Sequence, residues 1–431
     1  MAVPVFFSML SNTAIMIADT AMVGKLGPLA IASAGFGGIV YFTVLAFLGG
    51  AALGVQILSS RRFGEKDEKG VGETLVGAVF LSLTVGTILS ILGFFGGQGI
   101  MTFLADDADV IRESGLYLSY RFLGSVVFFS LFALRGFFDG IGLMFVGMVA
   151  SFVTTIANIL FNWFFIYGNA GFPAWGVKGA GFASALAGIP GVLVIIPFLW
   201  HPKVLGYLKN LSWFPEKSVL RELMYLGIAP ALESSLTNVS FVGFTKLAGL
   251  LGTIQLAATN IIVTCLALSF MPGFSFGIAA TTILGQALGA GKIRLAYEGT
   301  FRSATFSALV MGIMGVVFIL FGESLISFFT TNSLVILEAY PALCVVSLIQ
   351  IGDAYHMVIG SALRSAGMMY WVLYAYLGAS FFVMLPLAYF LGIVLSYGTV
   401  GLWSSVFLWL LLLAILFVKK FRQKEWVSIR I

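Results

Sequence analysis

Three acidic residues lie well inside long apolar stretches of a sequence that contains eighteen acids: Asp19, Glu233 and Asp353. An ionisable side chain at the centre of a bilayer is costly, and by default it faces a cavity or a partner. Structural ion pairs, or protonated carboxyls that lock helices together, would also explain such acids. Because only Arg121 is predicted to lie at comparable depth, we expect that the acids are not all paired. Some of them should bind protons or metal cations.

Polar neighbours accompany two of these acids. His356 follows Asp353 by three positions, so both side chains share one helical face. This spacing suits a proton relay or an auxiliary ligand of a cation site, whereas a hydrogen-bonded packing role is the alternative for His356. Glu233 follows Pro230 by three positions, where a kink would free backbone carbonyls as additional oxygen ligands.

Asn158 and Asn162 are four positions apart and offer two amide oxygens on one face of a helix. They fit either a cation site or hydrogen bonding between membrane helices. The sequence has no His/Cys metal cluster and no nucleophile elbow. A phosphate-binding loop is also absent, because Gly291-Lys292 is followed by Ile293 and lacks the required first glycine. We therefore expect a non-enzymatic protein without a cofactor or an ATPase partner, driven by an ion gradient.

The elements that must position these residues are membrane helices. Hydrophobic residues make up 60% of the 431 positions and charged residues 10%, well below the roughly 25% charged residues of a soluble domain. Apolar stretches recur at about the 20-residue length that crosses a bilayer, rather than as the ~10-residue strands of a barrel. The predicted spans are 3–24, 35–58, 72–95, 115–138, 143–168, 178–200, 223–248, 255–284, 299–321, 336–362, 368–393 and 399–418.

Helix-weakening residues inside these spans predict kinks at Pro4, Gly49-Gly50, Pro230, Pro272-Gly273 and Pro386. Basic residues concentrate after even-numbered spans, from Arg61 and Arg62 to Lys419, Lys420, Arg422, Lys424 and Arg430 in the tail. The positive-inside rule then places both termini in the cytoplasm of a multi-pass protein of the inner (plasma) membrane. Since the net charge of +5 is scattered over short loops, no nucleic-acid partner is expected.

The sequence also contains an internal repeat. Gly24-Lys25-Leu26-Gly27 recurs as Gly249-Leu250-Leu251-Gly252, a displacement of 249 − 24 = 225 positions. The same displacement relates Gly64 to Gly289, Gly97 to Gly322 and Gly142 to Gly367. Six spans per repeat, an even number, predict two homologous lobes related by a pseudo-two-fold axis along the membrane normal. We assign 1–200 to the N-lobe, 201–222 to a cytoplasmic linker and 223–431 to the C-lobe.

Two such lobes suit alternating access by a secondary transporter, whereas a duplicated scaffold or a channel is the alternative. Over essentially its whole length, the chain resembles the multidrug and toxic compound extrusion (MATE) transporters. The resemblance is strongest from Pro4 to the run Asp19-Thr20-Ala21-Met22-Val23-Gly24. It continues in Leu134-Arg135-Gly136 to Gly142, in Ala157-Asn158 with Asn162, and in Ala362-Leu363-Arg364 with Gly367. Glu233 and Asp353 are similar to the acids of the NorM-like branch.

The resemblance implies export of organic cations and other amphipathic compounds by a monomer, in antiport with Na⁺ or H⁺. By this likeness Glu233 and Asp353 form a C-lobe cation site, with Na⁺ as the metal. Asp19, Asn158 and Asn162 form an N-lobe site, and Ser184 stands where some members carry a threonine. The family's basic lead before the first span is missing, which predicts a truncated or misassigned start. The alternative is a flippase for lipid-linked or other anionic substrates, which would favour more buried cations.

Overall fold

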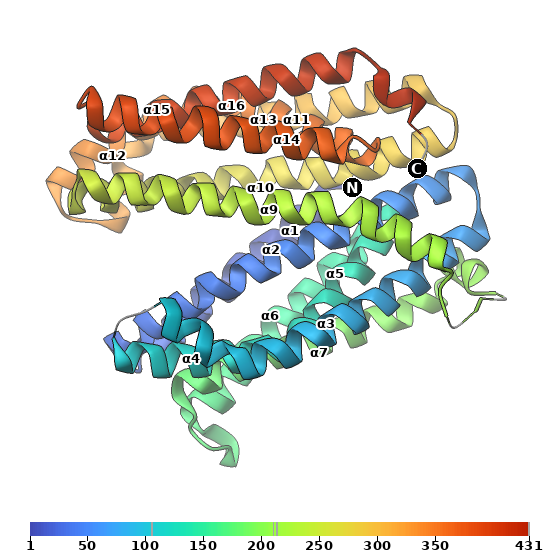
Figure 1. Ribbon diagram of the computed structural model, residues 1–431, viewed down its shortest axis with the longest axis horizontal. Coiled ribbons are helices and arrows are strands. Elements are labelled where there is room, and N and C mark those ends of the chain that lie inside the picture. Colours follow the sequence, from blue (N-terminus) through green and yellow to red (C-terminus); the bar gives the residue numbers. More distant parts are fainter. Residues whose placement is uncertain (105–106, 210, 213, 430–431) are drawn as a thin grey trace. The chain divides into compact units, whose positions relative to one another are not determined.

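The computed structural model describes residues 1–104, 107–209, 211–212 and 214–429, and within these ranges the chain contains helices but no strand (Figure 1). Arg430 of the basic tail lies outside the described residues. The chain divides into two compact units, Val3–Ala231 and Leu232–Ile431. Each unit is described by itself below.

The first unit is formed by long helices and the short turns that follow them. Its main helices are α1 (Ala2–Gly24), α2 (Pro28–Glu65), α3 (Glu68–Leu104), α4 (Ala108–Phe122), α5 (Ser125–Gly140), α6 (Met144–Tyr167) and α7 (Gly176–Ile195). The short helix α8 (Pro202–Leu205) follows, and then the first half of α9 (Lys217–Leu251). Hydrogen bonds from Ser8 to Ser151 and from Ser11 to Thr155 join α1 to α6.

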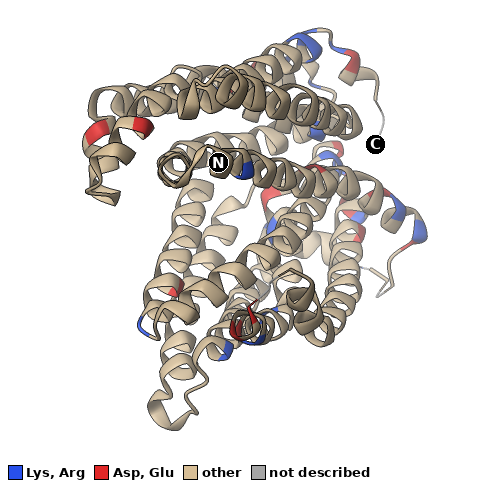
Figure 2. Cartoon of the chain, turned by 60° about the vertical axis from the view of Figure 1, so that its left-hand side comes forward, with Lys and Arg blue, Asp and Glu red and all other residues tan. Residues whose placement is uncertain are grey.

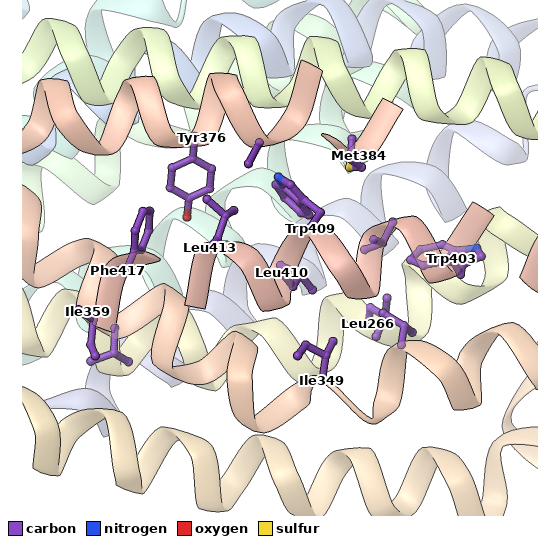
Figure 3. Packing of buried hydrophobic residues seen from close by; sticks show 14 of the residues in the cluster. Leu266, Ile349, Ile359, Tyr376, Met384, Trp403, Trp409, Leu410, Leu413 and Phe417 are labelled. Carbon is purple, nitrogen blue, oxygen red and sulfur yellow. The ribbon is translucent and has the colours of Figure 1, made fainter. Parts of the chain in front are cut away.

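The second unit begins within α9, and its main helices follow one another in the same order as those of the first unit. It contains α10 (Thr253–Gly289), α11 (Ile293–Phe329), α12 (Ser333–Ser347), α13 (Gln350–Ser365), α14 (Met369–Ala379), α15 (Leu385–Tyr389) and α16 (Gly398–Arg422). One large apolar cluster fills this unit. Figure 3 shows Trp403, Trp409 and Phe417 of α16 lying against residues of the neighbouring helices.

Helix boundaries repeat at the displacement found in the sequence. Starts at Pro28 and Thr253, and ends at Leu104 and Phe329, are each 225 positions apart. The starts of α3 and α11, of α4 and α12, of α5 and α13, and of α6 and α14 obey the same spacing. Gly27 and Gly252, also 225 apart, both have positive φ (110° and 138°), a conformation that glycine adopts without strain. The repeat is therefore a property of the backbone as well as of the sequence.

All twelve predicted spans fall on a helix or on a bent helix pair. Within the described residues, nine helices are long and apolar enough to cross a membrane, and two bent pairs bring the number to 11. The twelfth span lies on α9, whose 35 residues extend roughly 52 Å at 1.5 Å per residue. The prediction of an all-helical, multi-pass membrane protein is confirmed. Figure 2 shows most charged residues near helix ends.

The kinks predicted at Pro230 and Pro272 stay predictions, since α9 and α10 continue through both prolines as single helices. The two sharp bends, 47° between α4 and α5 and 56° between α12 and α13, contain no proline at the break and occupy equivalent positions of the repeat. At the first bend, a Cβ on Gly124 would lie 2.6 Å from the Cα of Ala185, so close packing against α7 requires glycine there. Near Pro386, π-helical turns interrupt the span.

Candidate cation sites in the two units

In the first unit, four predicted residues meet around the carboxylate of Asp19 on α1. The Asn162 amide of α6 donates a 2.5 Å hydrogen bond to Asp19 Oδ1. Ser184 Oγ of α7 lies 3.5 Å from Asp19 Oδ2 and accepts a 3.3 Å bond from Asn158 Nδ2. The helical spacing of Asn158 and Asn162 places both amides on the face of α6 that α1 and α7 cover. The structure therefore brings together the whole predicted N-lobe set.

Asn158, Asn162 and Ser184 are buried, and one of their oxygens has no partner among the described residues. Asn158 and Asn162 are at most 1% exposed. Among the described residues, Asn162 Oδ1 has no hydrogen-bond partner, although its burial would normally require one. Amide, hydroxyl and carboxylate oxygens are the ligands that hard cations such as Na⁺ prefer. The cluster is chemically suited to receive such a cation or a proton.

Arg121 of α4 belongs to the same cluster, although sequence reasoning did not assign it to the site. Its Nη1 lies 3.9 Å from Asp19 Oδ2, at the limit of an ion pair. The guanidinium faces the rings of Tyr41 and Tyr117, with centroids at 5.0 and 5.6 Å. Cation–π contacts of this kind stabilise a desolvated cation. Within the part of the chain that the structure describes, its Nε and Nη1 have no hydrogen-bond acceptor.

In the second unit, Glu233 is bound to an arginine. Arg364 Nε donates a 2.9 Å hydrogen bond to Glu233 Oε2, and Nη2 donates to Oε1, which makes the pair bidentate. The two side chains are only 12% and 8% exposed. The contact joins α9 to the last turn of α13, the helix that also carries Asp353. It also means that a cation approaching Glu233 meets a carboxylate whose charge Arg364 already balances.

Asp353 lies in a different part of the same network. Its Oδ1 is 2.9 Å from His356 Nδ1, and His356 Nε2 is 2.5 Å from the hydroxyl of Tyr376. When the carboxylate accepts from Nδ1, Nε2 of the neutral ring accepts from the Tyr376 hydroxyl. The His356 ring packs against Tyr376 and Phe417, which Figure 3 labels.

The predicted C-lobe pair is therefore linked through other side chains. The Arg364 guanidinium lies 5.5 Å from the centroid of the Tyr376 ring, so Tyr376 stands between the Glu233–Arg364 pair and the Asp353–His356 pair. No hydrogen bond joins the two carboxylates in the described ranges. Neither is there a group of three or more His, Cys, Asp or Glu side chains suited to a metal among those residues.

The expectation that the acids are not all paired missed one partner. Glu233 forms a close ion pair with Arg364, whereas Arg121 stands 3.9 Å from Asp19 and Asp353 has a hydrogen-bond contact with His356. The error came from the depth assigned to Arg364, which sequence reasoning placed at the end of its span. From the last turn of α13, the long arginine side chain reaches Glu233.

Comparison with known proteins decides the family. A family model described as MatE matches residues 4–164 and again residues 230–390. The chain belongs to the MatE family. The two matches are 226 positions apart, within one position of the repeat seen in the backbone.

MatE relatives and solved structures cover nearly the whole chain. A "Probable multidrug resistance protein NorM" from Mesorhizobium japonicum is 26% identical, over 99% of this chain and 93% of the relative. The Bacillus subtilis protein of the same name is 25% identical, over 94% and 90%. The outward-facing structure of a multidrug resistance MATE family transporter of the MOP superfamily has a TM-score of 0.90. At 19% identity over 99% of this chain and 94% of the other, that likeness shows the fold.

Proposed function

We propose that this MatE protein exports organic cations and other amphipathic drugs in exchange for Na⁺ or H⁺, by alternating access. The names of its relatives support multidrug efflux, and the repeated six-helix architecture supports alternating access. The chain works as a monomer in the plasma membrane, with both termini in the cytoplasm and the coupling ion as its only cofactor. It catalyses no covalent reaction and uses neither an ATPase partner nor nucleic acid.

The observation that carries this proposal is the oxygen-lined cluster around Asp19. A carboxylate and a hydroxyl meet there with an amide whose oxygen has no partner among the described residues, beside an arginine that does not form a close ion pair. When Na⁺ or H⁺ neutralises Asp19, the carboxylate loses its attraction for a cationic substrate. By linkage, the coupling ion and the substrate then weaken each other's binding.

The second unit contributes Glu233 and Asp353, with Na⁺ as the proposed metal at these carboxylates. Because Arg364 binds both oxygens of Glu233, the coupling ion competes there with a resident cation. Asp353 Oδ1 is hydrogen-bonded to His356, whereas Oδ2 has no partner among the described residues and is available to a coupling ion. His356 and Tyr376 provide a path by which a proton can leave this carboxyl.

The test uses purified protein in liposomes and follows efflux of a fluorescent organic cation under a Na⁺ gradient and, separately, a pH gradient. Asp19→Asn, Glu233→Gln and Asp353→Asn should each reduce ion-driven efflux, whereas Glu298→Gln, at an exposed acid of α11, should not. Tyr376→Phe keeps the ring but removes the hydroxyl, and it should slow efflux driven by the pH gradient more than efflux driven by Na⁺. Intact ion-driven efflux in all three acid variants would refute the proposed coupling.

One observation favours a second candidate, the flipping of lipid-linked or other anionic substrates. The Nε and Nη1 atoms of Arg121 are buried and lack acceptors within the described ranges, so this guanidinium could bind a substrate anion in addition to Asp19. If neither gradient drives several cationic dyes, but the protein moves a fluorescent anionic lipid between leaflets and Arg121→Gln stops this, the flippase function replaces the antiporter.

A further inference from the structure

A groove of about 660 Å³ opens between α13 and α16 of the second unit. Its apolar part is lined by Gly352 and Tyr355 of α13 and by Ala414, Ile415 and Val418 of α16. The groove is open because Gly352 has no side chain and Ala414 has only a methyl group. Ile415 is 56% exposed, so its side chain is accessible from outside the protein. The groove does not include Glu233 or Asp353, so it is separate from the candidate cation site of this unit.

Two cations close one end of the groove. Lys419 and Arg422 line it in the last turn of α16. Among the described residues neither has a carboxylate within ion-pair distance, whereas their neighbour Lys420 is paired with Glu425 at 2.5 Å. The Arg422 guanidinium lies 5.9 Å from the Phe301 ring of α11, which orients it beside the groove. Within the described ranges, the end of the groove therefore offers two positive charges without a paired carboxylate.

The groove has the geometry of a lipid rather than of a soluble anion. Ala414 and Arg422 are eight positions apart, so the apolar part extends about 12 Å along α16 before it reaches the cations. The end of a membrane helix with several basic residues lies at the interface, where such residues attract anionic headgroups. An acyl chain fits the apolar part, and a phosphate fits the charged end.

We propose that this groove binds an anionic phospholipid of the leaflet at the C-terminal end of α16, with the acyl chain against Ala414 and Ile415 and the phosphate at Lys419 and Arg422. The lipid holds α13 and α16 together. Because α13 carries Asp353, occupancy of the groove stabilises the helix that presents this acid. This inference depends on the membrane fold and not on the coupling ion or the exported substrate.

Native mass spectrometry of the full chain in detergent tests the proposal with dioleoylphosphatidylglycerol and dioleoylphosphatidylethanolamine. These lipids have the same chains but different headgroup charge. The double variant K419Q/R422Q should bind phosphatidylglycerol about 30-fold more weakly, since each interfacial cation contributes about 1 kcal/mol. The control K203Q/K217Q removes the same charge from two exposed residues elsewhere, and its affinity should equal that of the unmodified protein.

A third variant and a competitor separate the remaining explanations. Ile415→Trp keeps both cations but fills the apolar part, and it should weaken binding of phosphatidylglycerol as well. Inorganic phosphate in large excess should not displace the lipid. The proposal is overturned if K419Q/R422Q binds as the control does, if Ile415→Trp has no effect, if phosphate alone competes, or if the unmodified protein binds both lipids equally.

Discussion

The ion pair between Glu233 and Arg364 allows a quantitative prediction for stability. Its two hydrogen bonds and its burial mean that removing one member leaves the other charge desolvated and unpaired. Breaking a buried pair in this way costs roughly 3–5 kcal/mol. We expect losses of this size in the free energy of unfolding for Arg364→Gln and for Glu233→Gln. The double variant, which leaves no unpaired charge, should lose much less than the sum of the two.

The assay is a double-mutant cycle on reversible unfolding by SDS in mixed micelles, followed by tryptophan fluorescence. The interaction energy of the pair should reach roughly 2–3 kcal/mol, near the upper end for residues in direct contact. Arg294 and Glu298 of α11 provide the matched control. This pair is also joined at short range, 2.6 Å, but the Arg294 side chain is 92% exposed, so its cycle should show no measurable coupling.

Additive losses would refute this reasoning. If both single variants lost less than about 1 kcal/mol, as at an exposed pair, Arg364 and Glu233 would not be paired in the folded protein. Glu233 would then be open to a coupling cation without displacement of a resident one. The double-mutant cycle therefore also tests whether a coupling ion that binds Glu233 has to compete with Arg364.

Three further variants test other parts of the structure. Asn162→Leu removes the amide beside Asp19 together with its free oxygen, a proposed Na⁺ ligand, and the Na⁺ concentration for half-maximal efflux should rise roughly 10- to 100-fold, the usual loss of metal affinity when a supporting polar group is removed. Gly124→Ala forces a Cβ against the backbone of α7 and should destabilise the protein by about 1–3 kcal/mol, whereas Gly96→Ala, with open space around it, should not. Trp426→Ala empties a fully buried site near the C-terminus and should lower the unfolding free energy by roughly 3–5 kcal/mol in the SDS assay.

The fold was predictable because lipid restricts the backbone so strongly. Each backbone polar group must be satisfied within the segment, so that an apolar stretch of about 20 residues can only be a helix. The glycines of the repeat were informative for a similar reason, since Gly27 and Gly252 hold conformations that other residues adopt only with strain. The bends were not predictable from prolines. The break after α4 depends on how Gly124 packs against α7, and sequence alone does not show that contact.

The candidate sites were predictable to different degrees. Asn158 and Asn162 share a face through local spacing, and the resemblance associated them with Asp19, as the structure does. Arg364 was missed as the partner of Glu233 because the contact joins residues 131 positions apart, and local spacing carries no signal for it.

Repeat positions show that the duplicated scaffold does not carry a duplicated site. The residue 225 positions before Glu233 is Ser8, which is hydrogen-bonded to a serine of α6. The residue 225 positions before Arg364 is Asp139, so equivalent places at the ends of α5 and α13 carry opposite charges. Helix starts, turns and bends are shared because both halves meet the same packing requirements. Buried ionisable groups are not shared, because each has to be neutralised by its own surroundings. The loss of a carboxylate in one unit therefore has no equivalent group in the other unit to replace it.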